Sequence, residues 1–152
     1  MRKKDKKAVL IFGIGNNGRQ DDGLGWCFLD FLKEQNTTIE LEYRYQLQIE
    51  DSELISNYNQ VIFIDATKEK TEAGFYLKPC LPSEKYSFSS HALAPETVLY
   101  LSSELYNHKP IAFVFGIEGY NFGLKIGLSK KGALNLEKAK KYFKDTVLND
   151  YL

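Results

Sequence analysis

The chain has 152 residues, 43% of them hydrophobic, and its 20 basic and 20 acidic side chains give a formal net charge of zero. This length suits one globular domain with a sizeable core, so we expect a single domain over residues 1–152. The neutral charge provides no overall field for nucleic acid or an anionic membrane, and no apolar run reaches the length of a membrane span. Two cysteines without a C-x-x-C spacing indicate no disulfide framework, so we expect a cytoplasmic protein. We also expect a monomer.

Apolar runs and helical patterns alternate along the chain, and we assign them from their periodicity. In chain order the prediction is a strand over 7–12, a helix over 23–35, a strand over 39–45, a short helix over 51–58, a central strand over 61–64, a strand over 74–78, a helix over 95–106, a strand over 111–115, a short edge strand over 124–126, and a last helix that begins between 129 and 136 and ends near 149. This alternation predicts a three-layer α/β/α sandwich whose mostly parallel sheet has about five main strands.

Residues 13–25 form a glycine-rich connection between the first strand and the first helix. It lies at the carboxyl edge of the predicted sheet, where ligands bind in open α/β folds. Two adjacent carboxylates, Asp21 and Asp22, fall where the helix begins. One of them can cap the helix, which leaves the other for a different role.

The same connection contains the dinucleotide-binding fingerprint G-x-G-x-x-G at Gly13, Gly15 and Gly18. In that fingerprint the helix opens at once, so that its N-terminus meets a pyrophosphate. Here five residues intervene, and two of them are carboxylates that would repel a pyrophosphate. A nucleotide-binding module is therefore a secondary hypothesis.

Three residues could converge as ligands of a divalent metal: Asp22 after the first strand, Asp65 after the central strand, and His91 in the loop before the next helix. The carboxyl ends of parallel strands share one edge, and carboxylates with an imidazole suit ions such as nickel or zinc. Each residue also has a structural explanation. Asp22 could cap a helix, Asp65 could close a strand, and His91 could be hydrogen-bonded within its loop.

Written as G-x-G-N-x-x-x-x-D-D-G-x-G, residues 13–25 resemble the opening motif of the [NiFe]-hydrogenase maturation endopeptidases. That family trims the C-terminal tail of the hydrogenase large subunit after nickel insertion. The resemblance extends over most of the chain, and its further segments are residues 61–66, 89–96, 115–122 and 127–129.

The resemblance implies an endopeptidase that acts on a nickel-loaded large-subunit precursor and uses the substrate's nickel as its recognition element. The implied nickel ligands are Asp22, Asp65 and His91, and zinc or cadmium could occupy the same ligands in a crystal. The implied substrate loop contains Gly13, Gly15, Asn16, Asp21 and Gly23.

Two segments depart from the family pattern. Residues 46–50 replace the Asp-Gly-Gly-like turn common after the second strand, as in members that serve soluble cytoplasmic hydrogenases, and Glu118-Gly119 replaces the usual Glu-Pro. No nucleophile stands at a recognisable spacing, and Cys27 is predicted on the buried face of the first helix. A non-catalytic, nickel-sensing member of the family is a further alternative.

Overall fold

The computed structural model describes residues 6–35, 37–84 and 93–148. None of the helices in these ranges is long and apolar enough to cross a membrane. The elements are β1 (Lys7–Ile14), the 3-10 helix η1 (Gln20–Gly23), α1 (Leu24–Glu34), β2 (Glu40–Arg44), α2 (Asp51–Ile55), β3 (Tyr58–Thr67), β4 (Phe75–Pro79), α3 (Pro95–Tyr106), β5 (Ile111–Glu118) and α4 (Lys130–Asp145).

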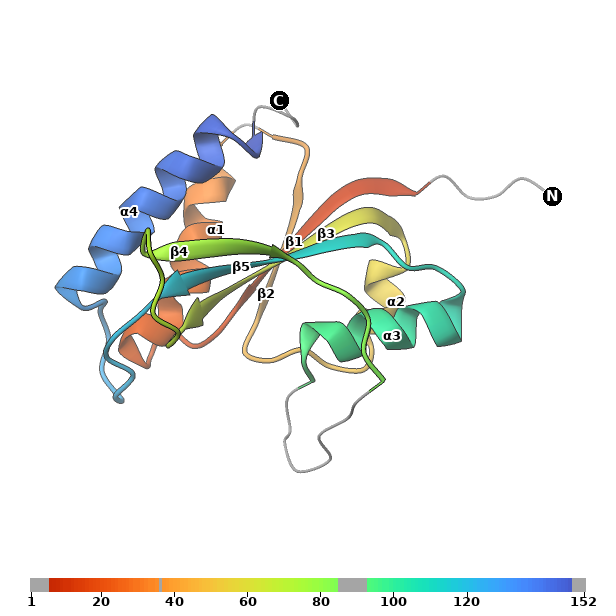
Figure 1. Ribbon diagram of the computed structural model, residues 1–152, viewed down its shortest axis with the longest axis horizontal. Helices are drawn as coiled ribbons and strands as arrows, with labels where there is room; N and C mark the ends of the chain where they lie inside the picture. The colour runs from red at the N-terminus through yellow and green to blue at the C-terminus, as the bar shows by residue number, and fades with distance from the viewer. Residues whose placement is uncertain (1–5, 36, 85–92, 149–152) are drawn as a thin grey trace.

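The five strands form one sheet in the order β2-β1-β3-β5-β4 (Figure 1). Neighbouring strands are parallel except for β4, which runs antiparallel to β5 at the edge. The central strands β1 and β3 are apolar on both sides of the sheet, as expected of strands that helices cover on both faces. The predicted three-layer α/β/α architecture with a mostly parallel sheet is confirmed.

Helices α1 and α4 cover one face of the sheet, and α2 and α3 cover the other (Figure 1). On the first face, Phe28 of α1 contacts the rings of Phe115 and Phe143, with centroid distances of 5.5 and 5.1 Å. On the second face, the parallel rings of Phe12 and Phe63 lie 5.4 Å apart beneath α3. Each face therefore has its own apolar core, which fixes the strands whose ends form the site.

The structure corrects three predicted boundaries. Residues 124–126 form no strand, because β4 already pairs with the edge of β5. Helix α2 ends at Ile55 rather than residue 58, since Tyr58 already belongs to β3. Strand β3 continues to Thr67, so Asp65 lies inside the strand instead of ending it.

Candidate active site

The carboxyl ends of β1 and β3 lie side by side in the sheet. The strand order reverses between these two strands, so this place is a topological switch point. After β1 the chain passes through α1 to β2 on one side, and α2 then leads to β3 on the other side. In register, Ile14 of β1 pairs with Asp65 of β3. Such a switch point leaves a crevice outside the strand ends, which is the usual ligand site of open α/β sheets.

The start of α1 lies unusually close to these strand ends. A Cβ on Gly25 would come within 2.7 Å of the carbonyl oxygen of Ile64 and 2.8 Å of that of Ile14. Only a glycine permits this approach, which brings the segment just before α1 over the ends of β1 and β3. That segment carries Asp22.

Asp22 is held against the end of β1 by a close backbone contact. Gly15 has a φ of +142°, and a Cβ there would lie 2.0 Å from the carbonyl oxygen of Asp22. The amide of Asn16 donates to the same oxygen at 3.1 Å. Burial raises the pKa of the Asp22 carboxyl, although the Asn16 amide and the charges of Arg19 and Lys68 oppose this shift.

Asp65 is the more strongly perturbed carboxyl. Burial, together with the nearby charge of Asp22, raises its pKa to about 7, against one hydrogen bond of 2.8 Å from the amide of Ala66. A carboxyl whose pKa is raised by burial and by the charge of a second carboxylate lies close to that partner in a poorly solvated place. Such a pair can accept a cation or share a proton.

The two carboxylates line one cavity of about 400 Å³ at the carboxyl edge of the sheet. Its other walls come from the segment after β2 and from the start of α3. The lining residues are Ile14, Gly15, Asp22, Tyr45, Gln46, Leu47, Asp65, Leu93, Ala94 and Pro95.

A partly buried ion pair fixes the wall that follows β2. Arg44 donates from Nε and Nη2 to Oδ1 of Asp51 at 3.1 and 3.0 Å, and Asp51 Oδ2 accepts from the amide of Gln48 at 2.9 Å. Leu47 forms a β-bridge with Leu93, which joins this wall to the segment before α3. The cavity walls are thus held by contacts on both sides of the opening.

Asp21 has a structural role, unlike its neighbour. It is fully buried and accepts hydrogen bonds from the amides of Tyr120, Asn121 and Ser129 and from Ser129 Oγ, at 2.7 to 3.1 Å. Burial alone would raise the pKa of Asp21, but the hydrogen bonds of Ser129, Tyr120 and Asn121 outweigh it and lower that pKa. Neither Asp21 nor Asp22 caps α1 with its side chain.

The other predicted loop residues do not line the cavity, apart from Gly15. Gly13 is buried in β1 beneath Leu29, Gly23 ends η1 beside Asn17, and Asn16 Oδ1 accepts from the amide of Gly18 at 2.8 Å. They shape the connection rather than its cavity.

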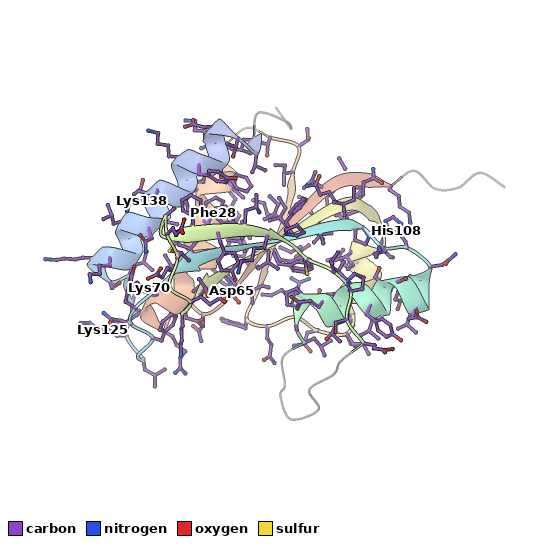
Figure 2. The ribbon with its side chains drawn as sticks, viewed as in Figure 1. Phe28, Asp65, Lys70, His108, Lys125 and Lys138 are labelled. Atoms are coloured by element: carbon purple, nitrogen blue, oxygen red, sulfur yellow. The ribbon has the colours of Figure 1, made fainter. Side chains whose placement is uncertain are left out.

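His91 lies outside the described residues, so its role as a ligand stays a prediction. Within the described ranges, no group of three or more His, Cys, Asp or Glu side chains could hold a metal ion. The other histidine, His108, lies at the opposite end of the molecule from Lys125 (Figure 2), where its Nε2 donates to the carbonyl oxygen of Tyr58 at 2.7 Å.

The structure adds residues that the sequence patterns did not assign to the site. Tyr45, Gln46 and Leu47 directly follow β2 and line the cavity. Lys68 follows β3 and is not part of the lining, but its charge acts on Asp22. All four residues lie just beyond the end of a strand. This position indicates a role in the site only once the order of the strands in the sheet is known. Cys27 is only partly buried, but it lies on α1 away from the cavity lining.

No protein-family model matches the chain, and no curated protein matches it in sequence. Solved structures, however, share its fold. The hydrogenase maturating endopeptidase HybD from E. coli superposes with a TM-score of 0.73 at 18% identity, over 94% of this chain and 93% of that protein. The [NiFe] hydrogenase maturation protease HycI from Thermococcus kodakarensis KOD1 gives 0.68 at 24% identity, over 91% and 89%. The hydrogenase 2 maturation peptidase from Thaumarchaeota archaeon SCGC_AB-539-E09 gives 0.65 at 16% identity, over 93% and 98%.

The chain therefore has the fold of the hydrogenase maturation endopeptidases. The family resemblance found in the sequence motifs is thus confirmed at the level of the fold. In each of the three comparisons it extends over about nine tenths or more of this chain.

Proposed function

We propose that this protein is an endopeptidase that removes the C-terminal extension of a nickel-loaded [NiFe]-hydrogenase large-subunit precursor, acting as a cytoplasmic monomer. One observation carries the proposal: Asp22 of η1 and Asp65 of β3 line the same cavity in a chain with this fold. Motifs around both aspartates are the ones that resemble the family.

The chemistry of the carboxylate pair fits a cation brought by the substrate. Burial raises the pKa of both groups, which means that two negative charges are unfavourable in this cavity. A divalent ion would relieve this repulsion, and oxygen ligands with an imidazole suit nickel. Asp22, Asp65 and His91 would hold the substrate's nickel and thereby orient the peptide to be cut.

The cavity walls would accept the peptide beside the ion. Tyr45, which lines the cavity and is 67% exposed, offers apolar surface to that peptide. The described lining residues include no serine, cysteine or histidine, and we assign no attacking group. The protein's own contribution would then be proximity and orientation.

The test compares processing by three variants, Asp22→Asn, Asp65→Asn and His91→Ala, with that by the wild-type protein. Purified nickel-loaded precursor is incubated with each, and shortening is read as a mobility shift. We expect each substitution to abolish processing while circular dichroism melting shows a folded protein. Full processing by a well-folded variant would remove that residue from the ligand set.

A further inference from the structure

A second surface next to the site has no role in the chemistry described above. Residues 120–127 connect β5 to α4 without regular structure, and we refer to them as the 120–127 loop. At its tip Leu124 is 83% exposed and Ile126 is 86% exposed. Among the described residues no other large apolar side chain is as exposed, and neither residue contributes to the two cores.

The loop is nevertheless held in place by specific contacts. Its first residues, Tyr120 and Asn121, donate their amides to the buried carboxylate of Asp21. Nearer the tip, the amide of Gln20 donates to the carbonyl oxygen of Lys125 at 2.8 Å, and Gln20 Oε1 accepts from the amide of Gly123 at 3.2 Å. A loop ordered in advance loses little conformational entropy when a partner binds.

These contacts attach the loop to the segment that carries Asp22. Gln20 and Asp21 directly precede Asp22 in η1. Lys68 provides a second link, because its Nζ lies 4.9 Å from the ring centroid of Phe122 and its charge acts on Asp22. A partner bound at the loop would therefore lie beside the mouth of the cavity.

The charged side chains within the loop and at the start of α4 are all basic. Residues 119–131 include Lys125, Lys130 and Lys131 and contain no acidic residue. Lys131 lies over the ring of Tyr120 at 5.5 Å, and Figure 2 shows Lys70 on the same side of the molecule as Lys125. Apolar side chains among cations complement a partner surface that is apolar at its centre and acidic around it.

We propose that the 120–127 loop is a docking site for the folded body of the protein substrate, through an acidic surface with exposed apolar residues that lies outside the peptide to be cut. This inference rests on the proposed function, and it names a second recognition element for the same substrate. The loop would supply affinity, and the cavity would act on the nickel and the peptide.

The test uses the double variant Leu124→Ser/Ile126→Ser, with Leu105→Ser/Ile111→Ser as a matched control. The control also removes one leucine and one isoleucine. Leu105, near the end of α3, is 58% exposed, and Ile111, at the start of β5, is 67% exposed. Initial rates of processing are measured against the concentration of nickel-loaded precursor, and binding of the same precursor is measured in parallel.

We expect the loop variant to raise KM about tenfold and to weaken precursor binding equally, with kcat and melting temperature unchanged. The control should keep wild-type KM. Lys125→Glu should also raise KM several-fold, and its KM should depend less on salt concentration than that of the wild type. A loop variant with wild-type KM and wild-type binding would overturn the docking site.

Two other outcomes separate this inference from the proposed function. Wild-type protein that binds the precursor through the loop but never shortens it would overturn the peptidase and keep the docking site. Wild-type protein that neither binds nor shortens the precursor would overturn both. Sedimentation could show that the protein self-associates, and vesicle assays could show that it binds phosphatidylglycerol. If the loop variant abolishes either interaction but binds the precursor as the wild type does, the loop binds a second copy of the chain or a membrane instead.

Discussion

At the scale of single residues, adjacent carboxylates have different environments. Asp21 is surrounded by four hydrogen-bond donors and its pKa is lowered, whereas burial raises the pKa of Asp22 at the cavity. The sequence shows only two aspartates in a row. Which one faces the cavity depends on the 3-10 turn of η1 and on donors about 100 residues further along the chain. We could expect one structural and one functional carboxylate, but not the hydrogen bonds that assign them.

Asp21→Asn should destabilise the protein by about 3 kcal/mol at pH 7, because the charge that four buried donors face is lost. Asp22→Asn, the matched substitution, should leave the free energy of unfolding unchanged or slightly higher. Urea unfolding of both variants measures this difference. Equal stability of the two variants would show that the contacts of Asp21 contribute little.

Asp65 should make the protein less stable as the pH rises. Its pKa is 3.8 in an unfolded chain and about 7 in the folded one. Between these values the native state binds more protons than the unfolded state, so the free energy of unfolding decreases from about pH 4 to about pH 7 and then levels. Asp65→Asn should therefore stabilise the protein at pH 8, by about 4 kcal/mol, and have little effect at pH 4.

The measurement is urea unfolding of wild type and Asp65→Asn at pH 4, 6 and 8, without divalent metal. Glu34→Gln, which removes an exposed acid from α1, is the control and should follow the wild type at each pH. A constant difference between Asp65→Asn and wild type at all three pH values would mean that Asp65 ionises normally.

At the scale of elements, the glycine-rich connection serves helix placement rather than phosphate binding. The helix does not open directly after Gly18, since residues 20–23 form η1 and α1 begins at Leu24. The close approach to the strand ends is made by Gly25, which lies outside the G-x-G-x-x-G pattern. The glycine-rich motif could be recognised in the sequence. Its structural role could not, because that role depends on which glycine contacts the sheet.

Gly15→Ala should cost about 3 kcal/mol of stability and abolish processing, because its φ is +142° and the new Cβ would meet the Asp22 carbonyl at 2.0 Å. Gly18→Ala is the control. Its Cβ would meet only the Oδ1 atom of the Asn16 side chain, at 3.1 Å, so its cost should stay below about 1 kcal/mol. Thermal melting and the processing assay test both variants, and a well-folded, active Gly15→Ala would contradict this geometry.

The misplaced strand at 124–126 has an instructive cause. Leu124 and Ile126 alternate with Lys125, which is the pattern of a half-buried strand, yet both apolar side chains are exposed. Periodicity reports which residues could share a buried face, but not whether a neighbouring strand exists to pair with. By contrast, the apolar runs of β1, β3 and β5 predicted the central sheet, because strands covered on both faces have few alternatives.

At the scale of the whole molecule, the strand order decides the site. It places the end of β1 beside that of β3, and so brings Asp22 and Asp65 to one cavity from positions 43 residues apart. The shared edge could be predicted from alternating strands and helices. The cavity wall of Tyr45 to Leu47 could not, because it requires β2 to lie next to β1.

The cavity should not bind a dinucleotide. Two carboxylates face it, and a pyrophosphate there would be repelled. We expect millimolar NAD or ATP to leave the melting temperature unchanged, since only a ligand that binds the native state raises it. A clear, saturable rise with NAD would revive the nucleotide-binding hypothesis, and Asp22→Asn provides the comparison because it removes one repelling charge.

The most direct test of the central claim is the intact mass of a [NiFe]-hydrogenase large-subunit precursor before and after incubation with this protein. Nickel-loaded and nickel-free precursor are treated in parallel, each with wild-type protein and with Asp22→Asn. We predict that only the nickel-loaded precursor treated with wild-type protein loses mass, by the weight of one C-terminal peptide. No loss with nickel-loaded precursor, or equal loss with and without nickel, would contradict it.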